Sequence, residues 1–121
     1  MSNVTESLER LIELAGARSA ALVDSSSGMV LGHAGSDEGL DIAAAANTEV
    51  VRAKLRTMNS LGLNDEIEDI LITLGRQYHL IRLLTSSKGG ALFLYLALDR
   101  ARANLAMARH QLRRVEAELA F

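Results

Sequence analysis

The 121-residue sequence contains no cysteine and no proline. Without cysteine it cannot form disulfides, thiolate nucleophiles or cysteine-ligated zinc sites, and its composition suits a reducing compartment. Without proline, its turns must be built from Gly, Ser, Asn and Asp. No apolar run approaches the roughly 20 residues of a membrane helix, and the N-terminus lacks the basic and apolar regions of a secretory signal. We therefore expect a cytoplasmic protein without membrane insertion.

Aromatic residues and excess charge are also scarce. Aromatic residues make up 3% of the chain and the formal net charge is −2. Binders of single-stranded nucleic acid need aromatic stacking platforms, and general nucleic-acid affinity needs clustered positive charge. We therefore expect no nucleic-acid partner. The length and the 49% hydrophobic content suit one globular domain over residues 1–121.

The segment Ala91–Asp99 is nearly all apolar and follows Gly89-Gly90. A continuous apolar run of this length is typical of a strand that is covered on both faces. A buried helical turn is the alternative, but the two glycines and the aromatic residues Phe93 and Tyr95 favour a strand. A central strand needs a cover on each face of its sheet, and the rest of the chain can supply both.

The hydrophobic periodicity of the remaining chain predicts three helices and five strands. The helices are expected at Val4–Ala15, Leu40–Asn59 and Arg100–Ala120, and the strands at Ser19–Asp24, Met29–Ala34, Ile70–Leu74, Tyr78–Leu84 and Ala91–Leu98. Asn3 and Glu6 resemble a capping box for the first helix, and Asp99 can cap the last. The first two strands read as a hairpin and the last three as a meander.

The long helix Leu40–Asn59 carries an apolar sector about twice the ~100° that one core contact needs. One face contains Leu40, Ala44, Val51, Leu55 and Met58, and an adjoining face contains Ile42, Ala46, Val50 and Ala53. A deeply buried helix in a monomer would give this pattern, as would alanine used for helix propensity. A helix packed between its own sheet and a second subunit would give it too, and the pattern does not decide between them.

Four carboxylates, Asp65, Glu66, Glu68 and Asp69, precede the strand Ile70–Leu74. Clustered carboxylates suggest a metal site, but hard cations need ligands folded around the ion, and the EF-hand spacing is absent. A solvated strand entry that protects a sheet edge explains them without a metal. We expect no metal site.

The predicted last helix is the most basic part of the chain. It contains Arg100, Arg102, Arg109, Arg113 and Arg114. A solvated helix face balanced by nearby acids is one interpretation, and a surface for an acidic partner is the other. We take Arg102, Arg109 and Arg113 as candidate partner-binding residues.

No catalytic or cofactor motif is recognisable. Lys88 precedes Gly89-Gly90, so the phosphate-loop spacing is missing, and no Gly-x-Ser-x-Gly elbow is present. The three histidines, His33, His79 and His110, lie in three different predicted elements. We therefore expect no enzyme and no cofactor.

The order of elements, together with several segments, resembles the roadblock/dynein light chain 7 family. The segments are Ala20–Asp24, Gly28–Leu31, Leu71–Leu74, Tyr78–Arg82, Leu94–Asp99 and, as in bacterial members, Ala103–Arg109. The patterns give the order α-β-β-α-β-β-β-α, and the fold class is α/β (α+β type). The resemblance implies that the five strands form one antiparallel sheet. It places the long helix on one face and the N- and C-terminal helices on the other.

The resemblance also implies a homodimer formed through the long helix and an edge strand, Ile67–Leu74. The interface residues would then be Ile42, Ala46, Val50, Ala53, Ile67, Ile70 and Ile72. Glu66 and Glu68 would lie near the strand junction, where they could set its register.

Members of this family are non-enzymatic platforms, and bacterial relatives regulate small Ras-like GTPases. The sequence therefore predicts a dimeric regulator of such a GTPase. A nucleotide-independent adaptor for a signalling or cytoskeletal protein is the alternative. A small-molecule sensor is a third possibility, but the chain offers few aromatic or polar residues for a pocket.

Overall fold

The computed structural model describes residues 4–84 and 91–119. Its elements are α1 (Val4–Ile12), β1 (Ala17–Asp24), β2 (Met29–Gly35), α2 (Leu40–Ser60), β3 (Ile70–Thr73), β4 (Gln77–Leu83), β5 (Leu92–Asp99) and α3 (Leu105–Glu118). This order is the predicted α-β-β-α-β-β-β-α. Three predicted features lie outside the described residues: the cap residue Asn3, the Lys88–Gly90 end of the turn before β5, and the helix end Ala120.

The five strands form one antiparallel sheet in the order β2-β1-β5-β4-β3. The central strand is β5, and its residues Phe93–Leu98 are all buried. The apolar run is therefore a strand, as predicted, and it is covered on both faces. The edges of the sheet are β2 and β3.

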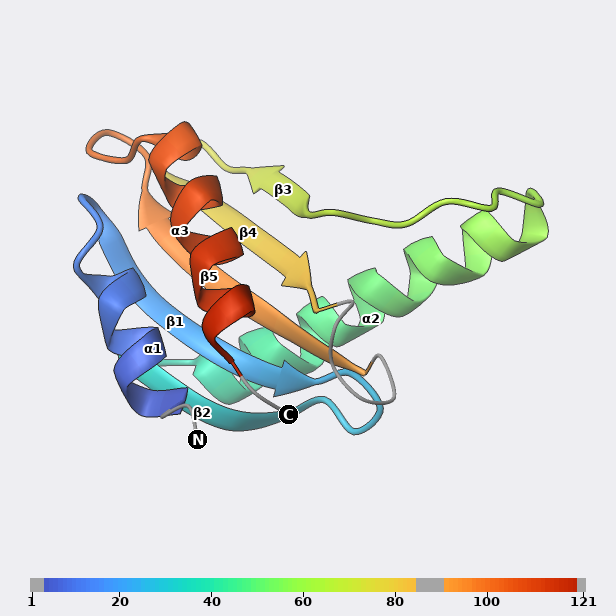
Figure 1. The fold of residues 1–121 in the computed structure, drawn as a ribbon, viewed down its shortest axis with the longest axis horizontal. Helices are drawn as coiled ribbons and strands as arrows, with labels where there is room; N and C mark the ends of the chain where they lie inside the picture. The colour runs from blue at the N-terminus through green and yellow to red at the C-terminus, as the bar shows by residue number, and fades with distance from the viewer. Residues whose placement is uncertain (1–3, 85–90, 120–121) are drawn as a thin grey trace.

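The side chains of β5 alternate between two hydrophobic clusters, as a strand requires. Leu94, Leu96 and Leu98 belong to the cluster under α1 and α3. Phe93 and Tyr95 belong to the cluster under α2. Figure 1 shows α1 and α3 on one side of the sheet and α2 on the other. The predicted three-layer arrangement is confirmed.

Helix α2 is longer than the sheet that it covers. Its C-terminal half and the returning segment 61–69 project from the body as an arm (Figure 1). Gly62 turns the chain at the tip with a φ of 68°. The exposed apolar residues of the arm are Leu55, Leu61 and Leu63, and Leu61 is 67% exposed. Across residues 4–84 and 91–119, no helix combines the length and the apolar character needed to span a membrane.

The last helix starts five residues later than predicted, at Leu105. Its cap is Asn104, whose side-chain oxygen accepts the Met107 N–H at 3.1 Å. The Asp99 carboxylate instead accepts the Ala101 N–H within the turn that follows β5. The chain needs this turn to pass from the middle layer to the outer one, so Arg102 lies in a turn and not on the helix.

Candidate protein-interaction site

Helix α2 presents one face to its own sheet. Leu40, Ala44, Val51 and Met58 are buried there, as their spacing predicts. The fifth residue predicted for this face, Leu55, lies on the projecting arm and is 44% exposed, so that part of the prediction is wrong. Two polar residues, Asn47 and Thr48, are buried on the same face and were not predicted. The Thr48 hydroxyl donates to the Ala44 carbonyl at 2.7 Å. The Asn47 side chain lies close enough to the Tyr95 hydroxyl to affect its pKa. The spacing of these two polar residues from Leu40 and Ala44 was the signal that could have placed them there.

The second apolar face of α2 lies in solvent in the single chain. Ile42 is 77% exposed, and Ala46, Val50 and Ala53 are also exposed. The helix is therefore not enclosed by its own chain, which removes deep burial in a monomer as an explanation of the wide apolar sector. Two explanations remain: alanine used for helix propensity, and a surface that another molecule covers.

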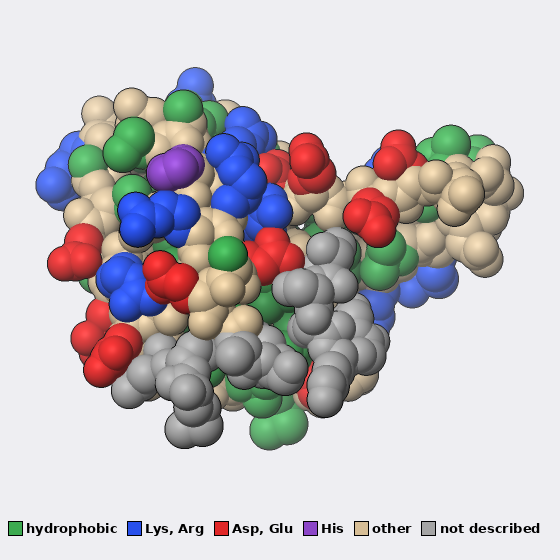
Figure 2. Space-filling model, in the orientation of Figure 1, with side chains coloured by type: hydrophobic (Ala, Val, Ile, Leu, Met, Phe, Trp, Pro, Cys, Tyr) green, Lys and Arg blue, Asp and Glu red, His purple; other side chains and the backbone are tan. Residues whose placement is uncertain are grey.

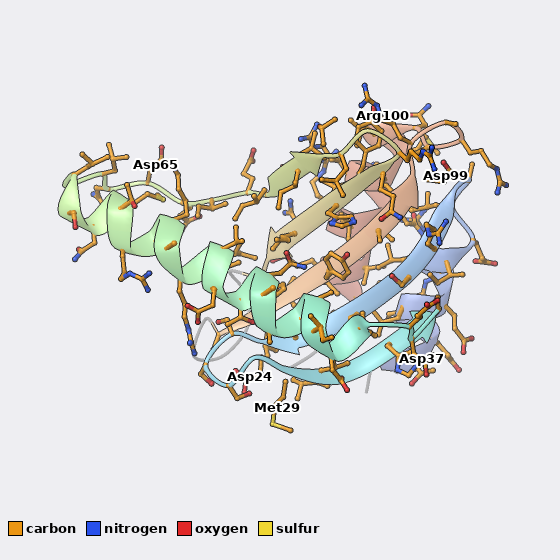
Figure 3. The ribbon with its side chains drawn as sticks, turned by 180° about the vertical axis from the view of Figure 1, so that it is seen from behind. Asp24, Met29, Asp37, Asp65, Asp99 and Arg100 are labelled. Carbon is orange, nitrogen blue, oxygen red and sulfur yellow. The ribbon has the colours of Figure 1, made fainter. Side chains whose placement is uncertain are left out.

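The contacts of α2 show which way its exposed face turns. On one flank Arg52 donates to the Ser26 carbonyl in the β1–β2 turn at 2.6 Å. On the opposite flank Asn47 reaches Tyr95 on β5, and helical spacing places Val50 beside it. Val50 therefore lies on the flank that faces β4 and β3. Figure 3 shows that α2 crosses the β1–β2 half of the sheet and leaves this other half without a helix.

Strand β3 forms the edge of that open half. Ile70 and Ile72 pair with Ile81 and His79 of β4, point to the α2 side of the sheet and are half-buried. Ile67 does not belong to the strand, which begins at Ile70 instead of Ile67. Residues 61–69 form the irregular returning part of the arm, and Asp69 at its end is bound to Arg109 on α3. Ile67 is half-buried in the irregular part of the arm.

A hollow of about 450 Å³ lies beside the start of α2, over the open half of the sheet. Ala43, Gln77, His79 and Tyr95 are among its lining residues. The His79 ring meets the Tyr95 ring edge-on with centroids 5.6 Å apart, and its Nε2 lies 2.8 Å from the Gln77 amide oxygen. Partial burial lowers the pKa of His79 and raises the pKa of Tyr95.

The lowered pKa of His79 predicts a loss of stability in mild acid. The unfolded chain protonates this histidine near pH 6.5, whereas the folded chain protonates it only at a lower pH. Between these two pKa values the folded chain therefore binds fewer protons than the unfolded chain, which destabilises the folded state as the pH falls. The contribution of neutral His79 to the free energy of unfolding is complete above pH 6.5 and is lost as the pH falls through the folded-state pKa. Urea unfolding at pH 7.5 and 5.5 should show a smaller loss for His79→Gln than for the wild type. His110→Gln, on the exposed face of α3, should keep the wild-type loss; if it behaves like His79→Gln, the assignment is wrong.

The arginines of the predicted partner surface lie in three environments. Figure 2 shows basic side chains gathered over α3, where the sequence contains arginine and no lysine. Arg113 is exposed on α3 and Arg102 is exposed in the preceding turn, and neither forms an ion pair with a described residue. Arg109 is half-buried, and its guanidinium binds both carboxylate oxygens of Asp69 at 3.0 and 3.2 Å. That hydrogen bonding raises the pKa of Arg109. Arg102 and Arg113 are thus more available than Arg109 to bind a partner. The structure of the single chain does not test whether they do so.

The Arg109–Asp69 pair connects α3 to the start of the edge strand. A double-mutant cycle with Arg109→Gln and Asp69→Asn should give a coupling free energy of about 1 kcal/mol, since the geometry is bidentate but one partner is partly solvated. The exposed Arg52–Glu49 pair, at 3.2 Å within α2, should give about 0.3 kcal/mol in the matched cycle. Equal coupling in the two cycles would show that the link to β3 has no special strength.

Solved structures share this architecture. A roadblock/LC7 domain from Streptomyces avermitilis superimposes with a TM-score of 0.82 at 14% identity, covering 96% of this chain and 93% of that one. Myxococcus xanthus MglB gives 0.81 at 18% identity, covering 95% and 89%. The chain has the roadblock/LC7 fold. The gliding protein MglB from Thermus thermophilus gives 0.70 at 23% identity, covering 94% and 88%.

No model of a known protein family matches the sequence, and no curated protein matches it either. Identities below 25% establish the shared roadblock fold and leave the activity to be argued from the surface. The features that distinguish the surface are the exposed face of α2, the free edge β3 and the arginines over α3.

Proposed function

We propose that this roadblock-fold chain is a non-enzymatic, cytoplasmic, homodimeric platform that binds a small Ras-like GTPase. The observation that carries the proposal is the apolar face of α2, which its own chain leaves exposed beside an uncovered half-sheet and a free strand edge. A single copy holds these three surfaces in one region. One second copy can cover all of them.

In the proposed dimer, the two α2 helices pack side by side along the flank that carries Ala46 and Val50. The β3 strands pair across the two-fold axis and join the two sheets. Each projecting arm then lies over the partner's open half-sheet, where Leu61 and Leu63 lose their exposure. Glu66 and Glu68 lie next to the strand junction, and their repulsion penalises shifted registers. One solved structure with this fold is described as MglB with tetrameric arrangement, so self-assembly of that protein supports the model.

The GTPase partner is supported by the resemblance of the sequence to bacterial roadblock proteins and by the fold shared with MglB. A platform of this kind can act on a GTPase without a catalytic residue of its own, by holding the switch loops in one arrangement. It then has to bind the GTP and GDP states with different affinities, because equal affinities shift no equilibrium. The exposed Arg102 and Arg113 would contact acidic groups of the partner.

The test is affinity capture from native lysate with the purified protein, run in parallel with a non-hydrolysable GTP analogue and with GDP. We expect a small GTPase to be retained in one nucleotide state, and the purified pair to bind with at least about tenfold preference for that state. Arg113→Glu should weaken binding of the GTPase, because it reverses the charge that would face acidic groups of the partner. Partners retained equally in both states would instead support the nucleotide-independent adaptor.

A further inference from the structure

The strand β2 is the sheet edge opposite β3, so it stays accessible when the β3 edge is used for dimerisation. Its sequence, Met-Val-Leu-Gly-His-Ala-Gly, contains no Asp, Glu, Lys or Arg. Edge strands are usually protected by charged residues, prolines, β-bulges or covering elements, because their free backbone groups can pair with another chain. The edge β2 has neither a charge nor a proline within the strand, and one register shift, at Leu31, interrupts it.

The side chains of this edge are unusually apolar for exposed positions. Met29 is 65% exposed and Leu31 is 54% exposed. The register with β1 shifts at Leu22/Val23: Gly32 pairs with Leu22 and Val30 with Val23, so Leu31 has no partner on β1. Figure 3 shows Met29 projecting from the edge, away from the sheet.

The backbone of β2 also offers pairing groups. The Ser36 N–H donates to the Arg18 carbonyl at 2.9 Å, which fixes the alternation of hydrogen-bonded pairs along β1 and β2. His33, opposite Ala21, then lies at a non-hydrogen-bonded position, where an antiparallel strand directs its N–H and C=O away from its neighbour. An added strand could bond these groups.

Acidic residues stand at both ends of this edge. Asp24 pairs with Met29 at one end, and Asp37 and Glu38 follow β2 at the other. Figure 3 shows Asp24 and Asp37 near opposite ends of the strand. Hydrogen bonds from Ser26 lower the pKa of Asp24, so this carboxylate stays charged at neutral pH. The ligand chemistry that fits is therefore apolar in the centre and basic at the ends.

We propose that the β2 edge binds an extended segment of a partner protein by strand addition, with apolar side chains against Met29 and Leu31 and Lys or Arg at both ends. A second copy of this chain does not fit, because antiparallel pairing of two β2 edges sets Asp24 of each against Asp37 and Glu38 of the other. Parallel pairing brings like acids together as well. The inference is independent of the GTPase proposal, since it concerns the opposite edge of the sheet.

The probe is a labelled nine-residue peptide of alternating Val and Thr with two Lys residues at each end. Two comparison peptides carry Glu at the ends or a central Pro. Binding is measured by fluorescence anisotropy, and its location by amide chemical-shift changes in the ¹⁵N-labelled protein. We expect the Lys peptide to perturb Met29–Gly35. We expect both comparison peptides to bind at least about tenfold more weakly, because one reverses the charge complementarity and the other removes a ladder donor.

Leu31→Lys should weaken binding of the Lys peptide at least about tenfold, because the substitution removes an apolar contact and adds a charge of the same sign as the peptide's. The matched control is Met107→Lys, since Met107 is 55% exposed on α3, far from this edge, and should leave binding unchanged. The proposal is overturned if the Lys peptide does not bind, if its shifts map to β3 or α3, or if Leu31→Lys and Met107→Lys behave alike. The proposal would also be overturned if the dimers associate further as the concentration rises and Leu31→Lys abolishes this association. The occupant of the β2 edge would then be a second copy of this chain.

Discussion

Gly35→Ala should destabilise the protein by about 3 kcal/mol or more. Gly35 ends β2 with a φ of +78°, a left-handed conformation that costs an L-residue roughly 1–2 kcal/mol. An added Cβ would also lie 2.5 Å from the Arg18 carbonyl oxygen and 2.8 Å from Ile12 Cδ1. The carbonyl belongs to the backbone of the neighbouring strand and cannot rotate away, so the strand pair has to separate locally and lose packing under α1.

Gly62→Ala provides the matched control for this variant. Gly62 has a φ of +68°, but no atom lies within 4 Å of the position that its Cβ would take. Its loss should therefore be the conformational part alone, roughly 1–2 kcal/mol. Urea unfolding of both variants at one protein concentration measures the difference directly. Equal losses would mean that the close approach at Gly35 relaxes at no cost.

The sequence predicts most of this fold because the strands and helices have local signals. The apolar run of β5 and the periodicity of α2 are properties of neighbouring residues, and both elements are where the patterns predict. The predicted start of α3 is wrong by five residues, because the sequence contains two residues suited to cap the helix, Asp99 and Asn104. The helix begins after Asn104 because the residues before it connect β5 to the outer layer. The length of this connection depends on the tertiary structure and cannot be read from the local sequence.

The candidate site is less predictable because it depends on pairs that are far apart in the chain. The exposed apolar face of α2 follows from periodicity, but its orientation towards the open half-sheet follows from Asn47 meeting Tyr95. The engagement of Arg109 by Asp69 is equally non-local, and it leaves Arg109 a poorer partner residue than Arg113. The absence of charge on β2 is visible in the sequence, yet it gains meaning only when the strand order makes β2 an edge.

Ala46→Glu should convert the proposed dimer into monomers. In the dimer model this residue lies between the two α2 helices, where a carboxylate loses its hydration. The residues three and four positions away on its own helix, Ile42, Ala43, Glu49 and Val50, include no cation. An uncompensated buried charge costs about 3–5 kcal/mol, which corresponds to a rise in the dissociation constant of at least a hundredfold. The variant chain should still fold, because Ala46 is exposed in the single chain. Analytical ultracentrifugation over a micromolar concentration series gives the dissociation constant, and circular dichroism confirms the fold.

Ala106→Glu is the matched control, because Ala106 is also an exposed helical alanine but lies on α3. The two variants make the same change in charge and volume, so only their positions differ. Ala53→Glu, two helical turns along the same face, should act like Ala46→Glu. If Ala46→Glu and Ala53→Glu sediment as dimers, the interface does not use this face. The exposed apolar arm would then have to be covered by a different molecule, and the edge β3 would be open to a partner strand in the same way as β2.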